Sequence, residues 1–164
     1  MAVKTIEIHG DNQYETFTRT RVACRGIAVQ EGRILISHEV NVDHYLIPGG
    51  GREGNETLEE CCVREVREET GYIVTPTRQL LTIHEYYEEY KYVSHYFLCT
   101  VTGETQRNLT DEERKRGLVP EWVELDQILA IFARHADYGP TNEEKRGAYL
   151  REYTALMEFL EHIP

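Results

Sequence analysis

The amino-acid sequence predicts an α/β fold in which a mixed β-sheet lies between helices. Strand-like patterns fill most of the first two-thirds of the 164 residues, one amphipathic helix interrupts them, and helical patterns close the chain. This order indicates a sheet that is covered on both faces. No repeat, linker-like stretch or low-complexity segment divides the sequence, so residues 1–164 are expected to form a single domain.

Alternation of apolar and polar residues predicts the first strands. Residues 3–8 and 17–29 each form one strand, and residues 34–40 return from the second through a turn at Gly32. Residues 44–51, "HYLIPGGG", begin as a short apolar strand and continue into a glycine-rich loop.

The second half of the sequence continues this pattern. Residues 80–87 and 92–102 are predicted to form a long hairpin rich in tyrosine. Residues 107–120 are expected to form a polar loop with at most a helical turn. Residues 121–125 are a final short strand, and a helix starts near Asp126.

Two longer helices are predicted from caps and periodicity. The central helix covers residues 57–70, because Thr57 and Glu60 can form a capping box and Gly71 is a typical left-handed stop. The C-terminal helix covers residues 143–162, and it should dock on the core through apolar residues spaced by four and three. These residues are Tyr149, Tyr153, Leu156, Leu160 and Ile163.

Composition excludes several classes of protein. With 40% hydrophobic and 29% charged residues, the chain is too apolar for intrinsic disorder, and it has no apolar run long enough to span a membrane. A net charge of −11 disfavours nonspecific nucleic-acid binding. The expected compartment is the cytoplasm, since no secretory signal is visible. The four cysteines lack metal-site spacing and are predicted to be small buried side chains.

The central helix carries an unusual acidic stripe. At 100° per residue, its core-facing side continues directly into three carboxylates within about a third of the circumference. Like charges at this spacing repel each other, and partly buried carboxylates need partners, for which hard divalent cations are well suited. A solvated acidic face is the plain alternative. The stripe consists of Leu58, Cys61, Cys62, Glu65, Glu68 and Glu69.

The glycine-rich loop strengthens the case for a ligand site. It lies directly before the helix N-terminus, where a backbone without side chains can approach a ligand closely. A tight turn would also explain the glycines, so the fixed relation between loop and carboxylates is the more informative observation.

Residues 50–72, "GGREGNETLEECCVREVREETGY", resemble the Nudix box. The fixed positions of that pattern all match, and the one mild departure is Tyr72, where an aliphatic residue is usual. The order of strands and helices around the box is similar to the α/β/α sandwich of the Nudix hydrolases. The matching positions are Gly50, Glu56, Arg64, Glu65, Val66, Glu68, Glu69, Gly71 and Tyr72.

The resemblance implies a metal-dependent pyrophosphohydrolase that uses Mg²⁺ or Mn²⁺. Its substrate would be a nucleoside diphosphate linked to another moiety. By this resemblance Glu65 and Glu69 would be the principal metal ligands, and Glu68 would join them directly or through water. The Gly49 carbonyl would be a further ligand, and Arg64 would orient the carboxylates.

The resemblance also bears on the general base, which accepts a proton from the attacking water. Glu65 is the first choice, with Glu112 or Glu113 in the downstream loop and Glu85 in the hairpin as alternatives. Glu56 would buttress the loop and the metal site.

The substrate is less well defined by the sequence. A small nucleotide is the expected partner, with neither nonspecific nucleic acid nor a membrane, and a homodimer is left open. The tyrosines of residues 86–96 could stack on a base, although sheet packing explains them equally well. Four cationic residues could contact phosphates: Arg25, Arg33, Arg52 and Lys91.

Two other functions remain open at this stage. A Nudix-fold module could bind nucleotides without catalysis, but such modules are expected to have lost acidic residues of the box, and none is missing here. A related diphosphate isomerase would need a catalytic cysteine and glutamate, for which Cys99 is the remaining candidate.

Overall fold

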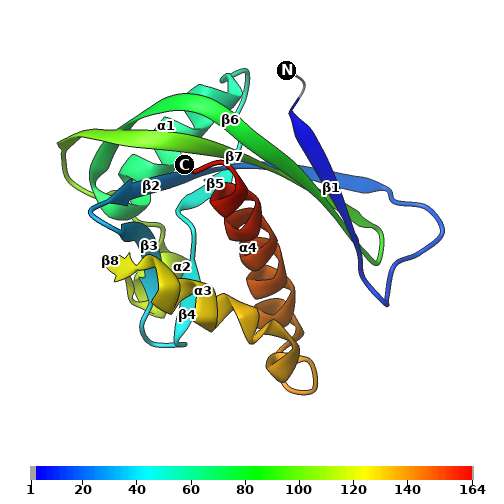
Figure 1. Ribbon diagram of the computed structural model, residues 1–164. Helices are drawn as coiled ribbons and strands as arrows, with labels where there is room; N and C mark the ends of the chain where they lie inside the picture. Colours follow the sequence, from blue (N-terminus) through cyan, green and yellow to red (C-terminus); the bar gives the residue numbers. More distant parts are fainter. Residues whose placement is uncertain (1–2, 164) are drawn as a thin grey trace.

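The computed structural model of the protein describes residues 3–163 and shows a sheet with helices on both sides (Figure 1). The eight-stranded sheet runs in the order β1-β6-β7-β2-β3-β4, with β5 paired to β2 and β8 paired to β3. The strands are β1 Lys4–His9, β2 Arg19–Gln30, β3 Arg33–Glu39, β4 His44–Leu46, β5 Gly49–Gly51, β6 Tyr72–Tyr87, β7 Tyr90–Glu104 and β8 Leu118–Glu124. The helices are α1 Leu58–Thr70, α2 Asp111–Arg116, α3 Leu125–Ala133, η1 His135–Tyr138 and α4 Glu143–Glu161.

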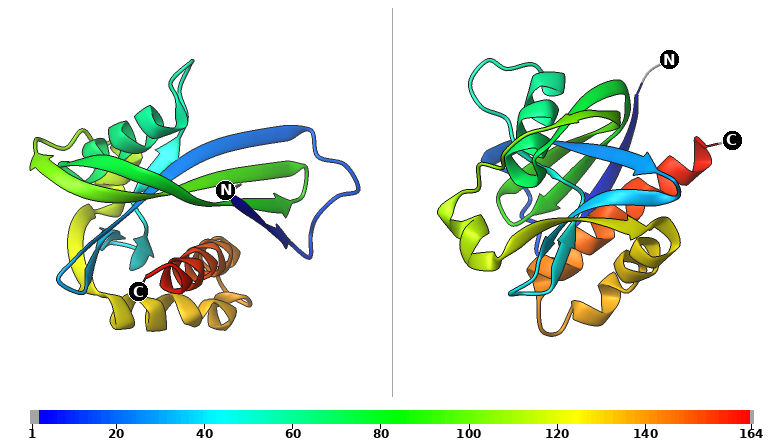
Figure 2. Two further views of the ribbon diagram at one scale, coloured as in Figure 1. Left: turned by 45° about the horizontal axis from the view of Figure 1, so that its top comes forward. Right: turned by 90° about the vertical axis from the view of Figure 1, so that its left-hand side faces the viewer.

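Helix α1 covers one face of the sheet, and α3 and α4 cover the other (Figure 2). Two apolar clusters fill the two interfaces. Cys62, Val66 and Phe97 belong to the cluster under α1, while Phe132 and Leu156 belong to the larger cluster on the α3–α4 side. The predicted α/β fold with a mixed sheet between helices is therefore confirmed.

The long hairpin is also confirmed, and it is longer than predicted. Strands β6 and β7 pair antiparallel from Tyr72↔Glu104 to Tyr87↔Tyr90. The prediction began the first strand at residue 80, but β6 begins at Tyr72 and contains Pro76, which cannot donate a ladder hydrogen bond. Pro76 is accommodated at a register shift in the pairing, which is where a strand tolerates proline.

The predicted hairpin between residues 17–29 and 34–40 is correct only at its turn. Strand β2 pairs with β3 at Val29↔Ile34 and Gln30↔Arg33, and it pairs with β7 in parallel along most of its length. Consecutive residues of β2 are buried on both faces, which is typical of a central strand. Two strands adjacent in sequence thus separate within the sheet.

The glycine-rich segment is not a simple loop, in contrast to the prediction. Gly49–Gly51 forms strand β5, which pairs antiparallel with β2. A Cβ at Gly49 would collide with the Cys24 carbonyl and with Arg25. Glycine is therefore required for the close approach of β5 to β2.

Residues 107–120 contain more structure than the expected polar loop. Thr110 and Glu113 form a capping box for α2. Strand β8 begins at Leu118 instead of residue 121 and contains Pro120, which lies opposite Ser37 of β3. Strand β8 has β3 as its one strand neighbour among residues 3–163, so it lies at an edge, where a missing N–H is tolerated.

The predicted caps of α1 are confirmed. Thr57 and Glu60 form the capping box, and Gly71 adopts the left-handed conformation with φ 78°. Along α4, Tyr149 and Leu156 are buried as predicted. Ile163 was expected on the docking face but lies beyond the end of the helix and is exposed.

All four cysteines are free and buried, which confirms that they are neither a disulfide framework nor a surface feature. Within residues 3–163, no helix has both the length and the apolar character needed to cross a membrane.

Candidate active site

Helix α1 holds its acidic stripe against the rest of the protein. Cys61 and Cys62 on the inward side are fully buried. The side chain of Glu65 is 14% exposed and that of Glu68 is 26% exposed, and Glu69 is also partly buried. The stripe is therefore not the freely solvated face that was its plain alternative.

Arg64 joins the acidic residues of the box to the glycine strand. Its Nε and Nη2 donate to the Glu56 carboxylate at 2.9 and 2.7 Å. Its Nη1 donates to Glu65 at 2.9 Å and to Glu68 at 3.1 Å, and Nη2 also donates to the Gly51 carbonyl at 2.9 Å. One guanidinium thus fixes three carboxylates and β5, and it offsets part of their repulsion.

Glu69 contacts strands β3 and β5 of the sheet. Its Oε2 accepts from the Gly49 N–H at 3.2 Å and from the Ser37 hydroxyl at 3.1 Å. Burial raises the pKa of Glu69 well above its usual value, and the negative charges of Glu113 and Glu65 raise it further. The Glu69 carboxylate is therefore poorly compensated by the protein's own cations.

Gly50 leaves the space that the Glu65 carboxylate occupies. A Cβ at this position would collide with the Glu65 side chain. Burial raises the pKa of Glu65 above its usual value, against the opposing effect of Arg64. The close packing of β5 on α1 therefore sets the position of this carboxylate.

The oxygen atoms gathered here fit a hard divalent cation. Glu65, Glu68 and Glu69 supply carboxylate oxygens, which Mg²⁺ and Mn²⁺ prefer to nitrogen or sulfur ligands. In the described part of the chain, no three His, Cys, Asp or Glu side chains stand close enough together to form a complete metal cluster.

A cavity of about 610 Å³ adjoins the glycine strand and is named here the α4 cavity. Its walls come from strands β2 to β7, from α2 and from the N-terminal half of α4. A second groove, of about 510 Å³, runs beside Glu65 and Arg52. Arg21 and Gly51 line both spaces, so the two meet next to the box.

The candidate bases lie in different places around the α4 cavity. Glu65 borders the groove, and Glu112 lines the cavity from α2. Glu113 is near enough to Glu65 and Glu69 to raise their pKa values, but its own carboxylate caps α2. Glu85 is a buried residue of the cavity wall on β6, 3.5 Å from Arg151.

Two of the four candidate phosphate contacts lie at the cavity or the groove, and the other two have partners elsewhere. Arg25 lines the α4 cavity and Arg52 lines the groove. Arg33 pairs with an exposed glutamate instead, and Lys91 lies over the rings of Phe17 and Tyr86.

Sequence reasoning missed Arg21. Strand β2 has period two, so Arg21 and Arg25 share one face of the strand, and both line the α4 cavity. That alternation was the available signal. Of the hairpin tyrosines, Tyr87 and Tyr92 line the cavity, and Tyr96 is a core residue.

The structure gives no support to Cys99 as a catalytic residue. Its Sγ lies 3.8 Å from Cys62 Sγ in the core beneath α1. Cys99 is not among the residues that line the α4 cavity or the groove.

Comparison with known proteins gives a consistent result. A family model described as the NUDIX domain matches residues 18–143. Diphosphoinositol polyphosphate phosphohydrolase 3-alpha of Mus musculus is 30% identical over 104 residues, which are 62% of this chain and 60% of that protein. A putative ADP-ribose pyrophosphatase, YjhB of Bacillus subtilis, is 29% identical over 78% of this chain and 67% of its own length.

Solved structures show the same fold. A NUDIX hydrolase from Nitrosomonas europaea has a TM-score of 0.59 and 20% identity, with 84% of this chain and 90% of that chain covered. A MutT protein from Methanosarcina mazei Go1 has a TM-score of 0.59 and 20% identity over 92% and 99% of the two chains.

Proposed function

The chain belongs to the Nudix family, whose model matches residues 18–143, and from this membership we propose that it is a metal-dependent pyrophosphohydrolase. The proposed reaction is hydrolysis of the diphosphate bond in a nucleoside diphosphate linked to another moiety. The observation that carries this proposal is the packing of the acidic stripe of α1 against strand β5. Glu69 accepts a hydrogen bond from Gly49 of that strand, and Glu65 lines the groove beside it.

We assign the metal site to Glu65, Glu68, Glu69 and the Gly49 carbonyl, with Mg²⁺ or Mn²⁺ as the ion. When bound, the ion would polarise the diphosphate and offset its negative charge during hydrolysis. The chain would supply the remaining functions. Arg64 orients two of the carboxylates through its Nη1 hydrogen bonds to Glu65 and Glu68.

Glu65 is the proposed general base. Its carboxylate borders the groove beside Gly51 and Arg21, where an attacking water can reach the diphosphate. A carboxylate in this position would take the proton of that water. Arg21, without an acidic partner among residues 3–163, would hold a phosphate oxygen of the substrate.

The decisive experiment compares Glu69→Gln with the wild-type protein. The substitution removes one ligand charge but keeps the size of the side chain, so hydrolysis should fall at least about 100-fold while the melting temperature changes little. Formation of the nucleoside monophosphate from a panel of nucleotide substrates with Mg²⁺, followed by chromatography, measures the effect. Glu59→Gln, at an exposed position on the same helix, is the matched control and should retain activity.

Two outcomes contradict the proposal. Wild-type turnover in Glu69→Gln would remove the metal assignment. Binding of nucleotides without any turnover by the wild-type protein would instead identify a non-catalytic binding module.

A further inference from the structure

The side chains that line the α4 cavity change from cationic to acidic across three neighbouring strands of the sheet. Arg21 of β2 lies opposite Tyr92 of β7, and Tyr92 lies opposite Glu85 of β6. Residues paired in this way share one face of the sheet, and all three line the cavity. Neighbouring strands are about 4.8 Å apart, so a cation, an aromatic ring and a carboxylate follow one another over about 10 Å.

The cations that remain free lie at the end of the cavity near the box. Arg116 is paired with Glu39, and Arg151 is paired with Glu152 and Glu85. Arg21 and Arg25 form no ion pair within residues 3–163. Arg25 lies opposite Gly49 of β5, and the Arg21 guanidinium lies beside Gly51 of the same strand. A diphosphate would therefore bind at this end.

Away from Arg21 and Arg25, the cavity lining holds more carboxylates than arginines. Four arginines and five glutamates line the whole cavity, and Arg116 and Arg151 are paired with Glu39 and Glu85 of that lining. Beyond Arg21 and Arg25, a substrate with several phosphates would therefore find no unpaired arginine among the lining residues. A neutral group that carries hydroxyls would instead donate hydrogen bonds to Glu85 and its neighbours.

Buried polar atoms without a hydrogen-bond partner belong to residues that line the same cavity. Within residues 3–163, the buried side-chain atoms that lack a hydrogen-bond partner are Arg25 Nε, His44 Nε2 and Tyr87 Oη, and all three residues line the cavity. His44 is only 4% exposed. Buried polar groups of this kind are normally satisfied by a ligand or by water.

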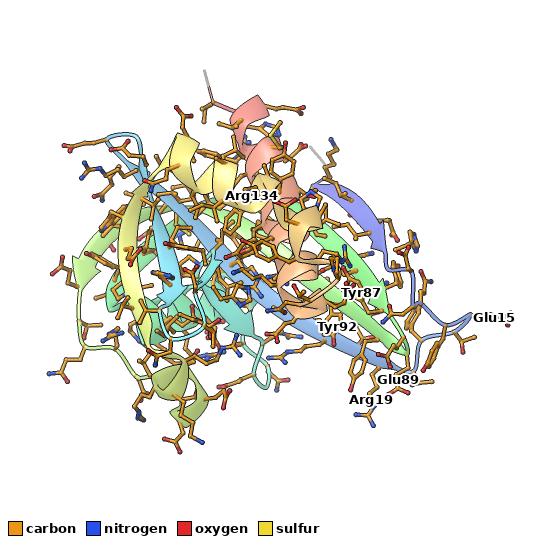
Figure 3. All side chains as sticks on the ribbon, turned by 90° about the horizontal axis from the view of Figure 1, so that it is seen from below. Glu15, Arg19, Tyr87, Glu89, Tyr92 and Arg134 are labelled. Carbon is orange, nitrogen blue, oxygen red and sulfur yellow. The ribbon has the colours of Figure 1, made fainter. Side chains whose placement is uncertain are left out.

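Tyr87 is held in place for such a contact. Figure 3 shows Tyr87 and Tyr92 between the β6–β7 hairpin and the N-terminal turns of α4, while Arg19 and Glu89 lie at the hairpin tip. A Cβ at Gly147 of α4 would come within 3.2 Å of Tyr87 Oη. The glycine in the middle of a helix thus leaves room for the tyrosine hydroxyl.

We propose that the α4 cavity binds a neutral sugar attached to the diphosphate, so that the substrate is a nucleoside diphosphate sugar and not a diphosphoinositol polyphosphate. Arg21 and Arg25 hold the diphosphate, and Tyr87 and Glu85 bind the sugar hydroxyls. This inference rests on the proposed function and specifies the substrate of the same site.

The first experiment compares substrates. Values of kcat/KM are measured with Mg²⁺ at one ionic strength for UDP-glucose, ADP-ribose, dGTP and a diphosphoinositol pentakisphosphate. The nucleoside diphosphate sugars should give the highest values, at least about 10-fold above the inositol compound. A preference for the inositol compound or for dGTP would overturn the sugar assignment but leave the pyrophosphohydrolase proposal intact.

The second experiment tests Tyr87 as a specificity residue. Tyr87→Phe should raise KM for the preferred sugar nucleotide about fivefold with unchanged kcat, because one hydrogen bond to the sugar is lost. Tyr86→Phe is the matched control, since Tyr86 is the next residue on the strand, interacts with Glu7 and does not line the cavity. An unchanged KM in Tyr87→Phe would contradict the assignment.

A direct binding measurement separates the two proposals. Calorimetric titration of UDP-glucose or ADP-ribose into the wild-type protein and Tyr87→Phe is made with Ca²⁺ and no Mg²⁺. If the wild-type protein binds the sugar nucleotide but hydrolyses none of the substrates, and Tyr87→Phe weakens this binding, the sugar site is supported and the hydrolase proposal is contradicted. Absence of both binding and hydrolysis would contradict both.

Discussion

Gly50 shows how one missing side chain can set the position of a carboxylate. Strand β5 lies so close to α1 that the Glu65 carboxylate takes the space where a Cβ of residue 50 would be. The neighbouring Gly51 is different, because its Cβ would only make ordinary contacts, 3.5 Å from Arg21 at the nearest. Two adjacent glycines therefore have different tolerances for a methyl group.

Gly50→Ala is expected to reduce hydrolysis at least about 100-fold. The new methyl group would displace the Glu65 side chain, and a shift of about 1 Å in a catalytic group is enough for such a loss. The fold should survive, since the colliding atoms belong to a movable side chain. Steady-state kinetics and a thermal melt measure both effects. Gly51→Ala is the control, and an equal loss of activity there would contradict the explanation.

At the residue scale, contacts within the box could be predicted from the sequence, whereas the arginines of the α4 cavity could not. The spacing of the box was sufficient to bring Glu56, Arg64 and Glu65 together, because all three lie on or just before one helix. The sequence could not show in this way that Arg21, and not Arg33, lines the α4 cavity. Both are exposed arginines near strand termini, and only the pairing of β2 with β5 and β7 brings one of them to the cavity.

At the element scale, α4 is tethered to the sheet by one fully buried carboxylate. Glu152 accepts hydrogen bonds from the Ile47 N–H at 2.5 Å, from Arg151 Nε at 3.0 Å and from the Tyr96 hydroxyl. Burial alone would raise the pKa of Glu152, but Arg151 and Arg25 outweigh it and hold the pKa below its usual value. The contact also fixes the strand-to-loop segment that leads into β5.

Glu152→Gln is expected to lower the free energy of unfolding by about 3–5 kcal/mol at pH 7, because the buried Arg151 loses its nearer partner and keeps only the 3.5 Å contact with Glu85. A lowered pKa stabilises the folded state above the pKa of the unfolded chain, about 4.3, and this stabilisation is lost as the pH falls. The difference between the variant and the wild type should therefore shrink below about pH 4. Urea unfolding at several pH values measures it.

Glu161→Gln provides the control on the same helix, since residue 161 is exposed. It should change the stability by less than about 0.5 kcal/mol. A constant difference between Glu152→Gln and the wild type from pH 7 to pH 3 would contradict the role of the Glu152 charge.

The elements themselves were predictable where local signals agreed. The capping box and Gly71 defined α1 almost to the residue. The same Thr-x-x-Glu signal at Thr110 and Glu113 was present for α2, but the short polar segment around it favoured a loop. Strand β5 was unpredictable because three glycines have no strand propensity, and its pairing with β2 comes from tertiary contact alone.

At the scale of the whole molecule, part of the net charge of −11 is concentrated in the acidic residues of the box. The acidic residues of the box repel each other, and Arg64 compensates only part of this repulsion. The protein should therefore gain stability when a divalent cation binds.

Addition of Mg²⁺ at about 100 times its dissociation constant should stabilise the fold by about 2.7 kcal/mol. For a chain of this size that corresponds to a rise in melting temperature of about 5–10 °C. Differential scanning calorimetry measures the shift, with NaCl at equal ionic strength as the control. The shift should disappear in Glu69→Gln, and a shift that persists there would place the ion elsewhere.

The overall arrangement was predictable from the order of patterns, whereas the order of strands in the sheet was not. Nothing local to β2 and β3 shows that they separate after two residue pairs, because the decision depends on β7, some 70 residues away. The α4 cavity arises from the same long-range pairing, which is why its walls could not be listed in advance.

The four buried thiols offer a way to time the opening of the molecule. Cys24, Cys61 and Cys62 are completely inaccessible and Cys99 is 9% exposed, and all four belong to the apolar cluster between α1 and the sheet. A thiol-specific dye can react with Cys61 and Cys62 only when α1 separates from the sheet. The rate of labelling therefore reports how often α1 separates from the sheet. A bound ion or substrate that stabilises the packing of α1 would slow the labelling.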